Sequence, residues 1–456
     1  MEKFKSQHFG YTPEQYKKFT GRAWVYLIMF SLLYCCFYCM RLNLSNASAL
    51  IQEGMGWGNE EIGILTSTLF WTYGIGHLIN GRISEMVGPS KFIVLAVILS
   101  FISNIAMGAF GGSLFVMALI WGINGYFQSM AWTPGIATLT NWWPGSKRGF
   151  AVGFAHAFSG FGQVLIILMV TLTAIIGKGI DWNSGFFQAL GWTAKDTWRL
   201  SFFIPPLLPI VMLVFYMLIG KPHPKKVGLP EYEESDPQRA AEEAEMAELI
   251  KTRGKLFPYI HVLSNKKFLL LVFICFLIGI ARYGLTTWVP LYFIQEFGKD
   301  IEEGLLGSLT LPIGMAIGTL TVPSLTDKYC PTNRLPAVIL SAVASAVMVL
   351  AFLLFNPTSP WQFAIIMILL FFAGFGIYSI NGLAFAVATD VGGRIFSGTC
   401  SGIMDFTVYM GAGVQAVIYG FVSEKFGWSW VFVSMGIFLI LIALLAFFGS
   451  PKKKAA

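Results

Sequence analysis

Long hydrophobic runs separated by short polar segments make up most of the chain. A helix of about 20 apolar residues crosses the ~30 Å hydrocarbon core of a membrane. Twelve runs reach that length with almost no charged side chains, and each is predicted to be a transmembrane helix. Their approximate bounds are 24–43, 61–82, 91–110, 113–136, 149–177, 199–220, 267–294, 305–325, 335–355, 361–387, 396–422 and 428–449.

Composition agrees with an all-α polytopic membrane protein. Of the 456 residues, 55% are hydrophobic and 12% are charged, and the mean hydropathy is +0.66. Soluble globular domains carry about 25% charged residues. The chain is therefore expected to have the lipid bilayer as its surroundings.

One charged segment divides the hydrophobic pattern into two sets of six spans. Parallel repeats of six helices, with a substrate site between them near the middle of the membrane, are typical of transporters. The sequence predicts two six-helix bundles with a cytoplasmic loop between them. The predicted divisions are an N-terminal segment 1–22, a bundle 23–220, a central loop 221–266, a bundle 267–450 and a basic tail 451–456.

Positive charge is distributed unevenly between alternate loops. With both ends placed on one side, that side holds 24 of the 31 Lys and Arg residues and the other side holds 5. Cytoplasmic loops carry the excess of Lys and Arg. Both ends are therefore expected in the cytoplasm of a cell (inner) membrane protein. The net charge of +7 reflects this topology and gives no reason to expect a nucleic-acid partner.

The two remaining cations, Arg41 and Arg282, lie inside the first span of each half. Each is the only charged residue in a run of about thirty, 23–52 and 268–295 respectively. An arginine at the centre of a membrane helix costs about 2.5–3.5 kcal/mol on insertion scales, so such a residue is a functional candidate. Its planar fork of donors suits phosphate oxygens. The alternative is that a nearby carboxylate neutralises each arginine permanently and the pair only organises packing.

A turn after the second span of each half combines acidic and basic residues. In GRISEMVGPSK the relevant residues are Gly81, Glu85, Gly88 and Lys91, and in SLTDKYCPTNR they are Asp327 and Arg334. These turns are either tight connections or charge-paired latches that act in gating. The first resembles the G-x-x-x-D/E-x-x-G-x-x-K/R turn of the major facilitator superfamily, and the second resembles a weaker copy.

A longer motif narrows the resemblance. GYFQSMAWTPGIATLTNWWPGSKRG, residues 125–149, is similar to the fourth span and following loop of the organophosphate:phosphate antiporter family. The motifs M-R-x-N at 40–43, R-Y-G at 282–284 and V-G-L-P at 227–230 agree with it. The resemblance covers essentially the whole chain. It implies that Arg41 and Arg282 bind substrate, and we expect Arg148 in the loop of this motif to act in gating.

Other polar and aromatic residues within the spans are candidates for the same site. His77 stands where the glycerol-3-phosphate transporter has a lysine, and His156 and Gln163 form a polar stripe on the fifth span. The family's pocket histidine aligns with Ser159, so its role does not transfer to His156. Each of these residues could equally be a packing residue, as could the aromatic candidates Tyr38, Tyr73, Trp132, Tyr283 and Tyr409.

Asp405 in the eleventh span departs from the family pattern, as does Leu42, which replaces a common lysine. If Asp405 faces the site, three interpretations compete. The carboxylate pairs with an arginine between substrates, binds a cationic group of a zwitterionic phosphate ester, or carries a proton. A hydrogen bond between helices is an equally simple alternative.

The sequence predicts exchange of a small organic phosphate for inorganic phosphate by rocker-switch alternating access, with the monomer as the functional unit. Alternatives are another small organic anion (a carboxylate, a sulfonate or a zwitterionic phosphodiester), proton coupling, or a membrane sensor of such a ligand. We expect no enzyme, cofactor or metal site, because the sequence offers no nucleophile–base set, metal-ligand cluster or P-loop.

Overall fold

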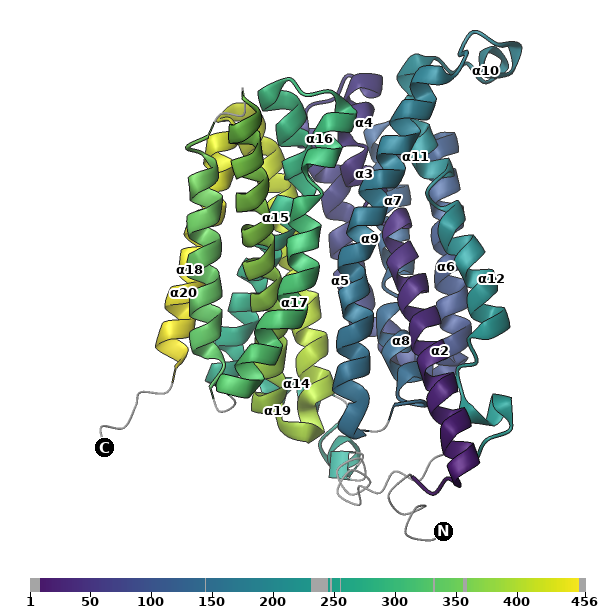
Figure 1. The fold of residues 1–456 in the computed structure, drawn as a ribbon, viewed down its shortest axis with the longest axis vertical. Coiled ribbons are helices and arrows are strands. Elements are labelled where there is room, and N and C mark those ends of the chain that lie inside the picture. The colour runs from purple at the N-terminus through teal and green to yellow at the C-terminus, as the bar shows by residue number, and fades with distance from the viewer. Residues whose placement is uncertain are drawn as a thin grey trace.

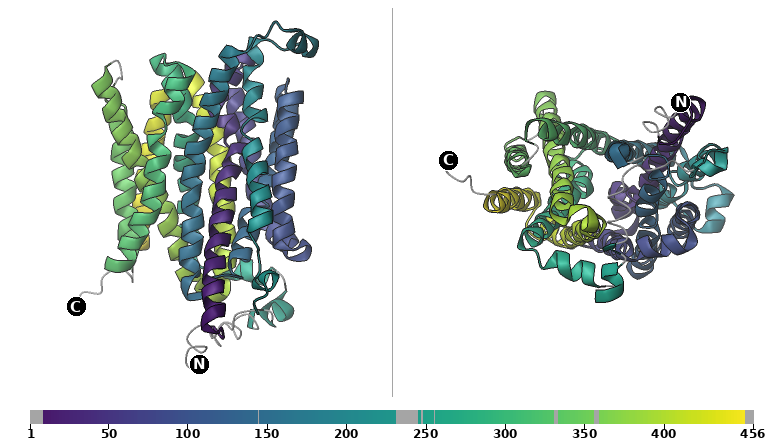
Figure 2. Two further views of the ribbon diagram at one scale, coloured as in Figure 1. Left: turned by 45° about the vertical axis from the view of Figure 1, so that its right-hand side comes forward. Right: turned by 90° about the horizontal axis from the view of Figure 1, so that it is seen from below.

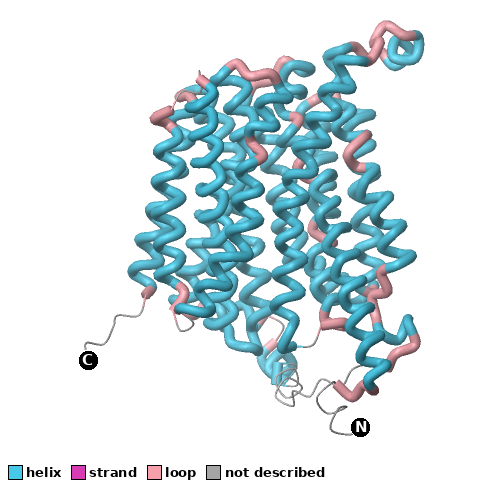
Figure 3. Tube along the Cα trace, in the orientation of Figure 1, coloured by secondary structure: helices cyan, strands magenta, loops and turns pink. Residues whose placement is uncertain are grey.

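The computed structural model describes residues 9–143, 145–230, 245–246, 248–254, 256–330, 333–355 and 359–450, without the side chains of 82, 85, 145, 146, 148, 388–390, 392–395 and 397. All regular structure in this part is helical (Figure 3). Twelve of the described helical segments are long and apolar enough to cross a membrane, which confirms the predicted number.

The first half of the chain, which holds six candidate spans, contains fourteen described helical elements. These are α2 (Pro13–Phe37), the 3-10 helix η1 (Tyr38–Met40), α3 (Asn43–Asn46), α4 (Ser48–Met55), α5 (Asn59–Val87), α6 (Pro89–Phe110), α7 (Leu114–Gln128), α8 (Trp132–Leu139), α9 (Gly145–Gly179), α10 (Gly185–Leu190), η2 (Ala194–Arg199), α11 (Leu200–Phe203), α12 (Leu207–Ile219) and η3 (Pro224–Val227).

The second half, which holds the other six candidate spans, contains seven described helical elements. These are α14 (Phe257–Leu263), α15 (Lys266–Phe297), α16 (Ile301–Gly307), α17 (Thr310–Tyr329), α18 (Leu335–Phe352), α19 (Pro360–Lys425) and α20 (Trp428–Gly449). The tenth and eleventh spans were predicted as separate helices, but the helical backbone of α19 continues through both. The link between them contains no proline, so the backbone can remain helical there.

The first span begins earlier and ends earlier than predicted. Thr12 and Gln15 form a reciprocal capping box, with Thr12 N donating to Gln15 Oε1 at 3.0 Å and Gln15 N donating to Thr12 Oγ1 at 3.3 Å. From this cap α2 runs unbroken to Phe37, so the helix of the first span begins within the segment 1–22 that was predicted to precede the bundle. Regular α-helix stops four residues before Arg41, at a break described below.

The two sets of spans lie side by side, purple to teal in one set and green to yellow in the other (Figures 1 and 2). They contact mainly along α5 with α19 and along α9 with α17. A Cβ added at Gly63 would overlap the backbone of Ala416, and one added at Gly160 would overlap the side chain of Ala316. Small residues therefore allow these helix pairs to approach closely, as in other membrane helix interfaces.

The two ends of the molecule are distinguished by the helices that reach them. We call the end at which α2 begins and α20 ends the near end, and the opposite end, where α4, α10 and α16 lie, the far end (Figure 1). Polar contacts join the two halves at the far end. Gln295 Nε2 donates to Gln52 Oε1 and to Asn59 Oδ1, both at 3.0 Å, and Asn59 Nδ2 donates to Ser423 Oγ at 2.9 Å.

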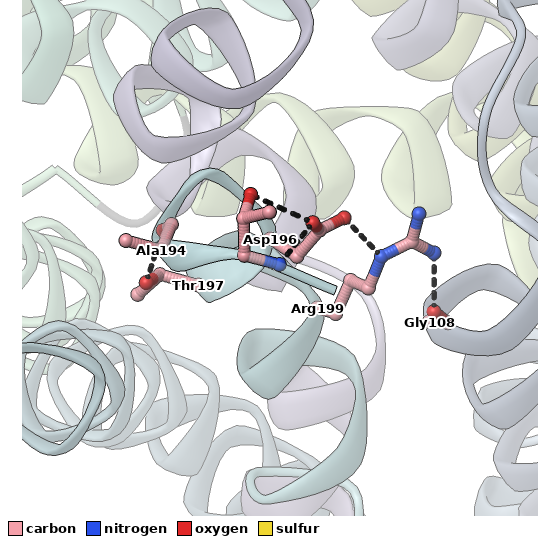
Figure 4. A network of polar contacts seen from close by, with 6 residues as sticks. Gly108, Ala194, Asp196, Thr197 and Arg199 are labelled. Atoms are coloured by element: carbon pink, nitrogen blue, oxygen red, sulfur yellow. Dashed lines mark hydrogen bonds and ion pairs between the residues drawn. The ribbon is translucent and has the colours of Figure 1, made fainter. Parts of the chain in front are cut away.

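Arg199, which lies outside the predicted site, has hydrogen-bond partners for its guanidinium group within the protein. Arg199 Nε donates to Asp196 Oδ1 at 2.7 Å, and its Nη1 donates to the Gly108 carbonyl at 2.7 Å (Figure 4). The guanidinium also lies 4.6 Å from the ring centroid of Trp198. The contacts of Arg199 therefore tie the start of the sixth span to the end of α6.

Candidate functional site

The two intramembrane arginines come from opposite halves and meet at one group of aromatic side chains. Arg41 follows η1 and Arg282 lies within α15, and the two residues are only 3% and 6% exposed. Tyr38 and Tyr409 each lie within electrostatic range of both guanidinium groups. Two positive charges in neighbouring positions and buried from solvent form a candidate anion site.

Arg41 contacts ring faces and has a free hydrogen-bonding nitrogen. Its guanidinium carbon lies 4.1 Å from the ring centroid of Tyr38 and 5.1 Å from that of Tyr73. Its Nη2 is buried and has no hydrogen-bond partner. Within the described residues no carboxylate forms an ion pair with Arg41. A buried, unpaired donor is costly, and an anionic ligand would satisfy it.

Arg282 is held by a tyrosine that also contacts the other half. Its Nη2 donates a hydrogen bond to the Tyr378 hydroxyl, and its guanidinium carbon lies 4.1 Å from the Tyr378 centroid and 4.7 Å from the Tyr283 centroid. The Tyr378 hydroxyl lies 3.4 Å from both Ser159 Oγ and Gln163 Nε2 on α9. Tyr378 therefore links Arg282 to the first half of the chain.

Asp405 lies close enough to Arg282 to interact with its charge. The carboxylate is half-buried and, among the side chains that the structure describes, it makes neither an ion pair nor a hydrogen bond. This arrangement gives no support to a helix–helix hydrogen bond. A ligand with a positive group near its phosphate could approach Arg282 and Asp405 together.

Three of the predicted aromatic residues, Tyr73, Tyr283 and Tyr409, form a cluster of rings between the halves. The Tyr409 centroid lies 4.2 Å from that of Tyr73 and 5.5 Å from that of Tyr283. Phe70 extends the cluster, with its centroid 4.6 Å from that of Tyr283. Ring faces and phenolic hydroxyls lie next to the two guanidinium groups. A ring face attracts a cation without accepting a directional hydrogen bond, so guanidinium N–H donors remain available to a ligand.

Both predicted histidines border this cluster. His77 stacks on Tyr409 at 5.8 Å, and its Nδ1 lies 3.5 Å from Thr133 Oγ1, while its Nε2 is buried without a partner. His156 lies 5.4 Å from Trp132 and 6.0 Å from Tyr378, measured between ring centroids. His156 is within range of the charges of both arginines.

Sequence reasoning missed Tyr378, Tyr34 and the contact role of Ser159. Tyr34 lies one helical turn before Tyr38, and its ring centroid is 4.7 Å from that of Trp132. The signal for Tyr378 was the polar run Y-S-I-N at 378–381 inside an otherwise apolar span. The spacing of four residues between Tyr34 and Tyr38 was the corresponding signal on α2.

The predicted gating residues whose side chains the structure describes lie toward the near end, around the turn from α5 to α6 and the turn from α17 to α18. Asp327 Oδ1 accepts from Arg334 Nη2 at 2.9 Å, which joins the end of α17 to the start of α18. Gly88 has a φ of 97° at the turn between α5 and α6, which favours glycine. Lys91 is exposed, and Gly81 lies within the last two turns of α5. The side chains of Glu85 and Arg148 lie outside the described part.

A small hollow lies beside the arginine cluster and draws its walls from both halves. Leu42 and Thr286, near Arg41 and Arg282 in the sequence, are among its lining residues. The full lining is Leu42, Asn46, Gln163, Ile167, Thr286, Pro290, Ser308, Leu311 and Pro312.

Comparisons with known proteins agree with this architecture. The chain is 28% identical over 449 residues to a probable hexose phosphate transport protein of Chlamydia trachomatis, which covers 95% of this chain and 92% of that protein. It is 27% identical over 430 residues to a glycerol-3-phosphate transporter of Bacillus subtilis, covering 92% of this chain and 91% of that protein.

Among solved structures, a bacterial homologue of the human lysosomal transporter Spinster, in an inward-facing and unoccupied conformation, matches with a TM-score of 0.74. The identity is 17%, and the match covers 94% of this chain and 96% of that one. A sequence model of the Major Facilitator Superfamily matches residues 30–416, which is most of the chain. The protein is therefore a multi-pass membrane protein that belongs to the Major Facilitator Superfamily, a family of membrane transporters.

Proposed function

We propose that the protein exchanges a small organic phosphate, of the sugar phosphate or glycerol phosphate class, for inorganic phosphate. The single observation that carries the proposal is the meeting of Arg41 and Arg282, from opposite halves, without a carboxylate partner for either in the described part. Two guanidinium forks suit the oxygens of a phosphoryl group, which accepts several charge-assisted hydrogen bonds.

We expect exchange because a site without a bound anion is energetically unfavourable. Two unpaired cations in a medium of low dielectric constant make the movement of the unloaded protein unfavourable. A bound anion offsets that cost, so loaded forms change access and empty forms do not. Organic phosphate and inorganic phosphate share the dianionic group, so the binding of either one allows the protein to change access.

Alternating access would expose the site at the near end and the far end in turn. We place the near end, where α2 begins and α20 ends, in the cytoplasm, because the near-end loops carry the excess of Lys and Arg. The two halves would rock about the arginine cluster, and the far-end contacts between Gln52, Asn59 and Gln295 would break when the far end opens. The monomer contains the whole proposed site.

Proteoliposomes loaded with labelled inorganic phosphate test the proposal. External glucose 6-phosphate or glycerol 3-phosphate should release the label, whereas glucose or glycerol should not. Release that needs no external anion would contradict obligatory exchange. Binding of an organic phosphate without any exchange would instead favour a membrane sensor.

Asp405 supports a second candidate cargo, a zwitterionic phosphate ester. Its half-buried carboxylate lies near Arg282 and makes no ion pair with a described residue. A substrate with an ammonium group near its phosphate could satisfy both charges. In the same vesicles, phosphoethanolamine should then release phosphate better than glycerol 3-phosphate does, and the reverse order would favour the first cargo.

A further inference from the structure

The backbone of the first span breaks at Arg41. The α-helix ends at Phe37, η1 covers Tyr38–Met40, and Arg41 itself has φ and ψ of −120° and −45°. Helical conformation returns only at Asn43. A break in the middle of a membrane frees backbone carbonyl groups that must find other partners inside the protein.

The carbonyl oxygen of Met40, directly before Arg41, receives two side-chain donors. Asn124 Nδ2 on α7 donates to it at 2.8 Å and Asn104 Nδ2 on α6 donates to it at 3.1 Å. Both asparagines are completely buried. The carbonyl oxygen accepts two hydrogen bonds, so both of its lone pairs are satisfied.

The residue after the break is tied to the same group. Asn43 Nδ2 donates to Asn104 Oδ1 at 2.8 Å and to the Ser201 carbonyl on α11 at 2.9 Å. We call Asn43, Asn104 and Asn124 the asparagine cluster. It attaches the backbone on both sides of Arg41 to three other helices, α6, α7 and α11.

We propose that Asn104 and Asn124 are positioning residues for anion binding, because they fix the break that directs the Arg41 guanidinium into the site. The inference rests on the proposed function. Arg41 lies on the rings of Tyr38 and Tyr73 and its Nη2 makes no hydrogen bond, so side-chain contacts leave this donor unfixed. Its position therefore depends on the backbone, and the asparagine cluster holds that backbone.

The cluster does more than pair buried polar groups. A continuous helix would satisfy the Met40 carbonyl internally and would need no asparagine on α6 or α7. Three buried amides from three helices instead stabilise an irregular segment at the one charged residue of the span. Displacement of a binding group by about 1 Å costs up to about 100-fold in function.

Asn124→Leu tests the proposal, because leucine has a similar size and removes the donor to Met40. We expect the Kd of the detergent-solubilised protein for inorganic phosphate to rise about tenfold and the KM for exchange to rise in parallel. Asn80→Leu is the matched control. Asn80 is fully buried and donates to Ser129 Oγ at 2.6 Å, away from Met40. It should lower thermal stability with little change in Kd.

A double-mutant cycle separates positioning from general damage. Combined with Arg41→Lys, Asn124→Leu should weaken phosphate binding by less than about twofold more, because the group it positions is already altered. Combined with Arg282→Lys, it should again weaken binding about tenfold. An equal loss in both backgrounds, or no loss in the single variant, overturns the inference.

A smaller substitution keeps the test decisive if the leucine variant does not fold. Asn124→Ser leaves space for a water molecule at the Met40 carbonyl, so we expect a loss of about threefold with the same dependence on Arg41. Wild-type protein that binds no phosphate overturns the proposed function instead. Wild-type binding with unchanged affinity in both Asn124 variants overturns only the role of the cluster.

Discussion

The surroundings of Arg41 and Arg282 differ, although the two residues occupy similar places in the two halves. Arg41 stands at a break in the backbone, lies on two aromatic rings and keeps a free donor. Arg282 stands in the unbroken helix α15 and donates to Tyr378. The first half thus holds its arginine through the backbone, and the second half holds it through a side chain.

Arg199 makes the comparison clearer. Its guanidinium is paired with Asp196 and with a carbonyl, as expected of a structural arginine. Arg282 donates to the Tyr378 hydroxyl, whereas Arg41 keeps a buried Nη2 without a partner. The unsatisfied hydrogen-bonding capacity of the guanidinium group therefore increases from Arg199 to Arg282 to Arg41. We expect Arg41 to be the first of the two site arginines to bind the anion.

The largest expected effect comes from Arg41→Lys and Arg282→Lys. Lysine keeps the charge but cannot reproduce the bidentate fork, so each variant should lower the initial rate of phosphate exchange in proteoliposomes by about 100-fold. Arg199→Lys is the control and should keep most of the rate. Near-normal exchange by both site variants would contradict the assignment of the site.

Sequence patterns predicted the membrane architecture and the two arginines because both depend on local composition. A span of some twenty apolar residues and a lone charge within it are visible without knowledge of any contact. The aromatic candidates Tyr38, Tyr73 and Tyr409 also lie at the arginine cluster.

The break at Arg41 could not be predicted, because FYCMRLNLSNAS contains neither proline nor glycine. Its cause lies about 60 and 80 residues away, in amides of α6 and α7 that satisfy the freed carbonyl. Tyr378 was missed for a similar reason. Only the folded structure, in which α19 packs against α15 and Tyr378 reaches toward α9, shows that its hydroxyl meets Arg282, Ser159 and Gln163.

The second prediction contrasts the two tyrosines that contact the arginines. Tyr378→Phe removes the hydroxyl that accepts from Arg282 and should raise the KM for exchange about tenfold, since a hydrogen bond to a charged group contributes about 1.5–3 kcal/mol. Tyr38→Phe keeps the ring on which Arg41 lies and should change the KM less than about twofold. Equal changes in KM for the two variants would contradict the idea that a side chain holds Arg282 and the backbone holds Arg41.

The third prediction changes the charge near Arg282 alone. Asp405→Asn should tighten inorganic phosphate binding about threefold, because it removes a negative charge within range of the guanidinium. Titration calorimetry of the detergent-solubilised protein measures the change. Asp181→Asn, an exposed acid, is the control and should leave the affinity unchanged. Weaker binding in Asp405→Asn would mean that the carboxylate supports the site.

The smallest expected effect concerns the far end, where side-chain amides from both halves form one hydrogen-bonded group. Gln295→Leu removes two hydrogen bonds, to Gln52 and Asn59, each worth about 0.5–1.5 kcal/mol net. The far end should then open more often. A cysteine introduced by Ser308→Cys, in the lining of the hollow, should react with an impermeant maleimide a few times faster from that side.

Lys178→Gln provides the comparison at the same end. It removes an exposed ion pair to Glu302, 2.8 Å long, and such pairs contribute about 0–1 kcal/mol. The labelling rate at position 308 should therefore change less than in Gln295→Leu. If Lys178→Gln has the larger effect, the exposed ion pair rather than the amide group keeps the far end closed.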